Sequence, residues 1–275
     1  SLHDALPILH RGRPLLTAEL PETGERFEGI LPPAAPGPAF ALRKRAVSII
    51  GLDRYVADGI LTTGQAEFLR RAVRERQNIL IAGATSSGKT TLANALLAEI
   101  AATGDRVLVL EDTIELQCAA RDHVPLRTRA GVVSMTELVR ATMRLRPDRV
   151  IVGEVRGGEA LDLVKVWGTG HPGGIATIHA GSALGALLRL EQLILEVAVN
   201  PPRALIAEAV NVVIHIAGRG RKRRVESIAR VVGFDGTGYR LADALETPFP
   251  ELMPVPLAAD AAAPSSSLDL PGELP

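Results

Sequence analysis

The clearest chemical signal in the sequence is the octapeptide at residues 83–90, which reads GATSSGKT. Its two glycines allow the backbone to curl, so that main-chain amides and the amino end of a helix can bind phosphate oxygens. Lys89 is placed to reach the β- and γ-phosphates of a nucleotide, and the Thr90 hydroxyl is placed to ligate Mg²⁺. The residues expected to hold the nucleotide are Gly83, Ala84, Thr85, Ser86, Ser87, Gly88, Lys89, Thr90 and Thr91. This spacing predicts a P-loop for ATP and Mg²⁺.

Glu154 is a candidate for supporting the metal ion. It follows an apolar run at residues 150–152, and P-loop enzymes place a metal-supporting acid at the carboxyl end of such a strand. An aspartate is usual there, and in this sequence Gly153 takes its place. A structural strand end is the alternative interpretation.

A second acidic cluster follows the strand that we predict over residues 106–110. It consists of Glu111, Asp112 and Glu115, and it should open onto the same crevice, because parallel strands end at the same edge of a sheet. One of these carboxylates can orient the attacking water, provided that it comes within hydrogen-bonding reach. A solvated strand end remains the alternative for each of them.

Two histidines lie near predicted strand ends. His179 follows the apolar run at residues 175–178, at the edge where this architecture binds ligands. From position alone, a structural role is favoured over a catalytic one, because a histidine at a strand end is more often structural. His171 stands in a turn between Gly170 and Pro172, which favours a structural role.

The elements around these motifs alternate between apolar strands and amphipathic helices. Thr62 with Gln65, and Ser134 with Glu137, form capping boxes that begin two of the helices. Strands are predicted over residues 78–82, 106–110, 149–153 and 175–178. Helices are predicted over residues 89–102, 134–145, 159–167 and 182–198. One more helix begins at residue 62, and a short one follows Pro202. Uniformly apolar strands that alternate with helices indicate a parallel sheet covered on both faces. Residues 211–217, 224–232 and 239–241 are typical of an antiparallel meander.

Composition excludes several classes of protein. The 275 residues are 47% hydrophobic, enough for a sizeable core, and contain 31 basic and 31 acidic residues. A net charge of zero and 3% aromatic residues argue against general attraction to DNA and against base stacking. The single Cys118 excludes an internal disulfide. No apolar run reaches the roughly 18–20 residues that span a bilayer.

Three zones differ in composition. Residues 1–50 are rich in proline and contain short apolar pieces, which predict a truncated α+β N-terminal domain and linker. Residues 51–253 form the predicted catalytic domain. Residues 254–275 are dominated by alanine, proline and serine and are predicted to be a disordered tail.

The motifs together resemble the traffic ATPases of type II and type IV secretion and pilus systems, and within them the conjugal-transfer branch. The matching segments are EDTIE at residues 111–115, LRPDRVIVGEVRG at 145–157 and GHPGGIATIHAGS at 170–182, in addition to the P-loop. The resemblance implies a RecA-like P-loop NTPase, a three-layer α/β sandwich behind an N-terminal domain. It also implies a homohexamer at the cytoplasmic face of the inner membrane, docked on secretion or conjugation proteins. We expect at most peripheral membrane association and no direct binding of DNA.

The same resemblance assigns roles to individual residues. Glu115 matches the catalytic glutamate, Glu154 the metal-supporting glutamate, and His179 the histidine near the γ-phosphate. Arg43, in FALRK, is similar to an N-terminal arginine that reaches the nucleotide. Arg144 and Arg146 are alternative candidates for this positive charge.

One basic run remains outside these motifs. Its members are Arg219, Arg221, Lys222, Arg223 and Arg224. Since the run lies between two predicted strands, a solvated hairpin turn is favoured over contact with DNA or membrane phosphates. Two other functions stay open: a RecA-class nucleic-acid motor, and a scaffold that binds ATP without turnover.

Overall fold

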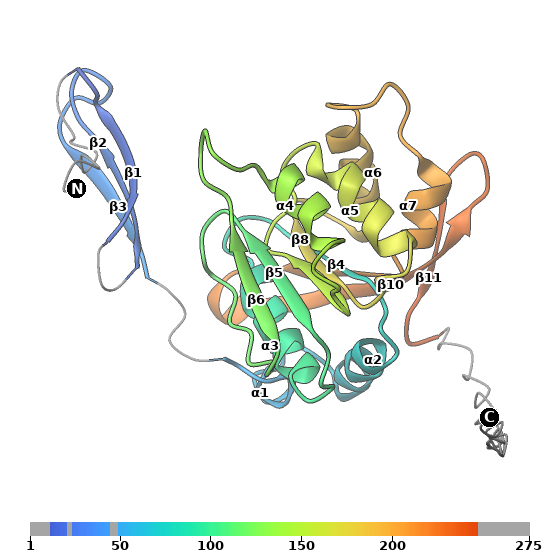
Figure 1. Cartoon of the computed structure of the whole chain (residues 1–275). Helices are drawn as coiled ribbons and strands as arrows, with labels where there is room; N and C mark the ends of the chain where they lie inside the picture. The colour runs from blue at the N-terminus through green and yellow to red at the C-terminus, as the bar shows by residue number, and fades with distance from the viewer. Residues whose placement is uncertain (1–11, 21–23, 45–48, 247–275) are drawn as a thin grey trace, which may run out of the picture.

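The computed structural model describes residues 12–20, 24–44 and 49–246, and these residues form two sheets (Figure 1). One sheet has three strands and the other has eight. The segment at residues 1–9 and the predicted tail at 254–275 lie outside the described residues. The predicted domain boundaries at residues 50/51 and 253/254 stay predictions.

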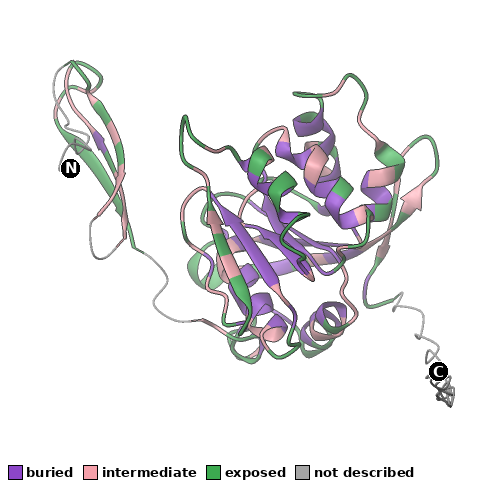
Figure 2. Ribbon diagram, in the orientation of Figure 1, coloured by how far each residue is buried: buried purple, intermediate pink, exposed green. Residues whose placement is uncertain are grey.

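The three-stranded sheet is antiparallel and is formed by β1 (Leu15–Glu19), β2 (Arg26–Ile30) and β3 (Ala39–Arg43). All five residues of β3 are exposed, and the sheet carries little buried colour in Figure 2. Phe27 and Phe40 stack on each other with ring centroids 6.0 Å apart. Within residues 12–20 and 24–44 there is no helix, so the described part of this region is a small β-sheet rather than an α+β unit.

The eight-stranded sheet has the order β11-β10-β9-β4-β8-β7-β5-β6. Its strands are β4 (Ile79–Ala82), β5 (Val107–Glu111), β6 (His123–Arg127), β7 (Arg149–Val152), β8 (Ile175–Ile178), β9 (Val212–Ala217), β10 (Arg224–Phe234) and β11 (Tyr239–Asp243). The pairs from β9 through β4 to β6 are parallel, and β9, β10 and β11 pair antiparallel. The predicted mostly parallel sheet with an antiparallel meander is therefore confirmed.

Helices cover both faces of this sheet, which makes the three layers visible in Figure 1. The helices are α1 (Leu52–Ala57), α2 (Thr63–Arg74), α3 (Lys89–Ile100), α4 (Met135–Thr142), α5 (Glu159–Gly168), α6 (Ala183–Ile194) and α7 (Arg203–Ala209), and η1 (Gly220–Lys222) is a 3₁₀ turn. Helices α1 to α3 lie on one face and α4 to α7 on the other. Both predicted capping boxes are present, at Thr62 and at Ser134.

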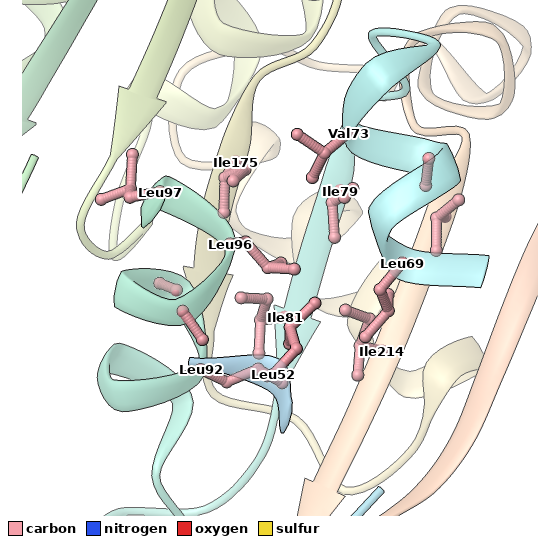
Figure 3. Packing of buried hydrophobic residues seen from close by; sticks show 14 of the residues in the cluster. Leu52, Leu69, Val73, Ile79, Ile81, Leu92, Leu96, Leu97, Ile175 and Ile214 are labelled. Carbon is pink, nitrogen blue, oxygen red and sulfur yellow. The ribbon is translucent and has the colours of Figure 1, made fainter. Parts of the chain in front are cut away.

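The core consists of two apolar clusters, one on each face. Every residue of β4, β7 and β8 is buried, because each of these strands points side chains into both clusters. Figure 3 shows the first cluster, in which Leu92 and Leu96 of α3 pack on Ile79 and Ile81 of β4. This packing fixes the strand and the helix that border the P-loop.

The structure differs from the sequence prediction at several elements. Helix α4 ends at Thr142 rather than at residue 145, and α6 ends at Ile194 rather than at residue 198. Strand β6 was not predicted. Its residues alternate between exposed and half-buried and include Pro125, which suits the edge of a sheet and resembles a loop in sequence.

A buried ion pair supports the sheet edge opposite the P-loop. Arg149, at the start of β7, is 1% exposed and donates from Nε to Asp105 Oδ2 at 2.6 Å. Its Nη2 and Nη1 donate to the carbonyl oxygens of Val73 and Gly173 at 3.0 and 3.3 Å. Arg76 also pairs with Asp105. The guanidinium of Arg149 is thus taken out of water and depends on Asp105 for its charge compensation.

Across the described residues, none of the helices combines the length and the apolar character needed to span a bilayer.

Candidate active site

A pocket of about 480 Å³ opens where the carboxyl ends of β4, β5, β7 and β8 meet. It is lined by residues from the P-loop, from the strand ends and from the three-stranded sheet. They are Arg26, Arg43, Ala84, Thr85, Ser86, Gly88, Lys89, Thr90, Thr91, Glu111, Asp112, Thr113, Glu115, Gly153, Glu154, Arg156, Thr177, His179 and Arg223. Segments from across the chain therefore meet at one sheet edge, as open parallel sheets predict.

The P-loop connects β4 to α3 and depends on its two glycines. Gly88 has a φ of +102° and is the N-cap of α3, a backbone conformation that disfavours other residues. Gly83 lies so close to β9 that a Cβ atom there would be 2.4 Å from the carbonyl oxygen of Ile216 and 2.5 Å from Ser87 Oγ. Since the first of these atoms is main chain in a buried strand, a side chain at Gly83 would force the loop to move.

We expect Gly83→Ala to lower the free energy of unfolding by about 1–3 kcal/mol and to weaken nucleotide binding, because overpacking shifts the loop. Thermal denaturation and a nucleotide-binding titration measure the two effects. The matched control is Gly64→Ala in the first turn of α2, where the new methyl group meets only Leu245 at 4.0 Å. Equal behaviour of the two variants would contradict the prediction.

Lys89 is buried at the start of α3 and holds the P-loop together. Its Nζ donates to the carbonyl oxygens of Gly83 and Ala84 at 2.9 and 3.1 Å, and it lies 3.3 Å from His179 Nδ1. Burial lowers the pKa of Lys89 from its usual value. Within the described residues, no carboxylate forms an ion pair with Lys89, so its charge is left for an anionic ligand.

Glu154 and His179 form a contact next to this ammonium group. His179 Nε2 lies 2.6 Å from Glu154 Oε1, and Arg156 Nε donates to Glu154 Oε2 at 2.7 Å. Because an ammonium group only donates, His179 Nδ1 accepts and Nε2 carries the proton. Burial, and then the charge of Lys89, lower the pKa of His179 below its usual value, so the imidazole is neutral at neutral pH.

Glu115 is bound by two arginines of the three-stranded sheet. Its Oε1 accepts from Arg26 Nη1 at 2.8 Å, and its Oε2 accepts from Arg43 Nη2 at 3.3 Å. Arg26 also donates to Thr113 Oγ1 at 2.7 Å. Arg26 was not predicted as a site residue, and it reaches the pocket because the β2–β3 register places it directly opposite Arg43.

Glu111 is neither a solvated strand end nor free to activate water. It is 5% exposed, and its Oε1 accepts from the main-chain amides of Glu115 and Leu116, both at 2.9 Å. A Cβ atom on Gly153 would lie 3.0 Å from Glu111 Cγ. Glu111 thus shapes the turn that carries Glu115, and its packing explains why a glycine stands before Glu154.

Other candidates lie outside the pocket or at its margin. Arg144 and Arg146 are exposed and do not line it. His171 has its Nδ1 3.0 Å from the Pro147 carbonyl oxygen, in the turn where a structural role was favoured. Asp112 does line the pocket, and its Oδ1 accepts from Thr128 Oγ1 at 2.8 Å.

The prediction of a solvated turn for the basic run is only partly correct. The run does connect β9 to β10 and includes η1, and Arg221 and Lys222 are exposed. Arg223, however, lines the pocket, and Arg219 Nη2 donates to the Thr85 carbonyl oxygen at 3.3 Å. The connection therefore lies against the P-loop.

Comparison with known proteins agrees with this geometry. The model of the family described as "Type II/IV secretion system protein" matches residues 25–227, a range that contains the P-loop and every strand end lining the pocket. The chain belongs to this family. The predicted secretion-ATPase family is thereby confirmed, and the chain is classed with the ATPases of type IV secretion and conjugal transfer.

Individual relatives support the same placement. The conjugal transfer protein TrbB of Rhizobium radiobacter is 51% identical over 230 residues, which cover 83% of this chain and 71% of the relative. The VirB11 ATPase of the Brucella suis type IV secretion system, solved with sulphate, superposes with a TM-score of 0.54 at 31% identity, covering 81% of this chain and 78% of that one. The Legionella pneumophila ATPase DotB, with a TM-score of 0.55 at 21% identity over 74% of this chain and 57% of its own, shares the fold.

Proposed function

We propose that the chain hydrolyses ATP with Mg²⁺, as one subunit of a ring that energises a type IV secretion or conjugal DNA-transfer apparatus. One observation carries the proposal: Lys89, Glu115, Glu154 and His179, which the sequence separates by up to 90 residues, line a single pocket with the P-loop. Family membership and the TrbB relatives supply the biological setting.

The pocket fits a Mg²⁺–triphosphate. The Lys89 ammonium lines the pocket and has no carboxylate partner within the described residues. It is therefore suited to bind phosphate oxygens. Thr90 and Glu154 line the same pocket. They would hold the metal ion directly or through a water molecule bound to it. When bound, Mg²⁺ neutralises charge that develops on the phosphates.

The other residues of the pocket have separate roles in binding the nucleotide and in hydrolysis. Residues 83–91 hold the phosphates through main-chain amides and hydroxyl groups. Glu115 orients the attacking water and accepts its proton. Neutral His179 lies against Glu154 and responds to the γ-phosphate through its contact with Lys89. Arg43 brings positive charge from the three-stranded sheet, and Arg26 accompanies it on Glu115.

The proposed assembly is a homohexamer located in the cytoplasm at the face of the inner membrane. We propose that its partners are membrane proteins of the secretion or conjugation apparatus, and that it contacts neither DNA nor the bilayer interior directly. Relatives that are named components of conjugal transfer and type IV secretion support this setting. The net charge of zero supports the absence of direct DNA binding.

Removing the Lys89 ammonium tests the proposal. We expect Lys89→Ala to reduce Mg²⁺-dependent phosphate release from ATP by about 10²–10³-fold, because a preorganised cation is lost where charge develops. The matched control is Lys165→Ala, an exposed lysine on α5 outside the pocket. Phosphate release that is equal in wild type and Lys89→Ala, or that persists without Mg²⁺, would overturn the proposal.

The same measurements address the two other functions. Stimulation of phosphate release by DNA, weakening with salt, would indicate a nucleic-acid motor. Tight ATP binding by the wild type without phosphate release, including in the presence of partner proteins, would indicate a scaffold.

A further inference from the structure

We infer that Arg223 is a nucleotide-binding residue, whose guanidinium donates to an α- or β-phosphate oxygen of the nucleotide held by its own chain. The inference rests on the proposed nucleotide site and adds to it a residue from a segment that no motif identified. Arg223 would bind the α- and β-phosphates, and the carboxylates of the pocket would carry out hydrolysis of the γ-phosphate.

The connection between β9 and β10 is built against the P-loop. Strand β9 is the neighbour of β4 in the sheet, and Gly83 lies directly on the Ile216 carbonyl oxygen of β9. Gly218 has a φ of +78°, and a Cβ atom there would lie 2.1 Å from the Lys222 carbonyl oxygen. This tight turn returns the chain toward the P-loop, where Arg219 donates to the Thr85 carbonyl oxygen at 3.3 Å.

Arg223 itself lies over Gly88, the N-cap of α3. A Cβ atom on Gly88 would meet Arg223 Nε at 2.8 Å and its Cδ and Cζ atoms at 3.1 Å. The guanidinium therefore occupies the space that a side chain on Gly88 would take, next to the amino end of the helix. This is the part of a P-loop whose amides hold the α- and β-phosphates.

Among the described residues, no carboxylate compensates the charge of Arg223. In the part of the chain that the structure describes, no carboxylate lies within 4.0 Å of its guanidinium, and its Nε is buried with no hydrogen-bond partner. The other arginines of the pocket are paired, Arg26 and Arg43 with Glu115, and Arg156 with Glu154. Lys89 is the other pocket cation without a carboxylate partner. A buried donor without an acceptor is costly, and a phosphate oxygen would satisfy it.

The sheet order separates Arg223 from the catalytic groups. His179, Glu154 and Glu115 follow β8, β7 and β5, on one side of β4, whereas Arg223 comes from β9 and β10 on the other side. A nucleotide on the P-loop would thus have the carboxylates on one flank and Arg223 on the other. Contact with the diphosphate part predicts that ATP and ADP depend on Arg223 equally.

The experiment compares ATP and ADP binding by wild type, Arg223→Ala and Arg223→Gln. The control is Arg221→Ala, which removes an exposed arginine two residues away. We expect both Arg223 variants to raise the dissociation constants of ATP and ADP by a common factor of about 10–100, as loss of a charge-assisted hydrogen bond predicts. Arg221→Ala should match wild type. Thermal denaturation without nucleotide should be unchanged by Arg223→Gln.

The outcomes separate this inference from the proposed function. If wild type binds no nucleotide, the proposed function fails and the inference with it. If wild type binds ATP and ADP and the Arg223 variants bind both as tightly as Arg221→Ala does, the inference alone is overturned. A loss confined to ATP would place Arg223 on the γ-phosphate and contradict the assignment. A loss of thermal stability without nucleotide in both Arg223 variants, with unchanged affinity in the folded fraction, would make Arg223 structural.

Discussion

Glu115→Gln should reduce ATP hydrolysis by about 10²–10⁴-fold while leaving ATP binding within a fewfold of wild type. General-base catalysis contributes a factor of this size, and an amide has the shape of the carboxylate but cannot take a proton from water. Glu115 accepts hydrogen bonds from Arg26 and Arg43, and an amide oxygen can still accept from one of them. The loss should therefore be catalytic rather than structural.

Single-turnover phosphate release, together with a nucleotide-binding titration, separates the two steps. Glu208→Gln on α7 is the matched control, since Glu208 is exposed and outside the pocket. It should hydrolyse ATP like the wild type. If Glu115→Gln retains full hydrolysis, Glu115 does not activate water. Asp112, which lines the same pocket, would then be the next carboxylate to replace.

Asp105→Ala should lower the free energy of unfolding by about 3–5 kcal/mol, the size expected when one partner of a buried pair is removed. The reason is Arg149, which is 1% exposed and would keep its positive charge without a carboxylate. Two main-chain carbonyl oxygens would remain as its acceptors. Urea denaturation at neutral pH measures the effect. The matched control is Asp122→Ala, because Asp122 pairs with Arg106 at the surface and is 53% exposed.

The contribution of Asp105 should depend on pH in one direction. Burial alone would raise the pKa of Asp105, but hydrogen bonds from Thr103 and Arg149 outweigh it and lower the pKa below its usual 3.8. A folded-state pKa below the unfolded value means that the stabilisation is complete above pH 3.8 and is lost as pH falls through the folded-state value. The difference in stability between wild type and Asp105→Ala should therefore shrink in acid. A constant difference down to strongly acidic pH would contradict this assignment.

Much of the fold could be predicted because its signals are local. The strands β4, β7 and β8 are apolar at every position, and the capping boxes at Thr62 and Ser134 define helix starts within four residues. Strand β6 escaped prediction because an edge strand buries little and carries no uniform apolar run. Its position beside β5 follows from pairing across the sheet, which a periodic pattern does not encode.

In the candidate site, too, residues that belong to local sequence signals were predicted, and residues placed by tertiary structure were not. The P-loop, Glu115, Glu154 and His179 were found because each lies at a strand end or in a contiguous motif. Arg26 and Arg223 were missed because each reaches the pocket through a strand register or a tight turn. Glu111 was misinterpreted, since only the folded turn shows its carboxylate bound to main-chain amides.

The three-stranded sheet touches the rest of the chain through charged side chains. Among the described residues its contacts include those of Arg26 and Arg43 with Glu115, of Arg26 with Thr113, and of Arg127 with Glu19, and neither apolar cluster includes a residue from this sheet. Such pairs weaken as dissolved ions screen them, over a Debye length of about 8 Å at physiological ionic strength. Salt concentration should thus loosen this attachment while leaving the packed layers intact, and so set how firmly Glu115 is restrained before nucleotide arrives.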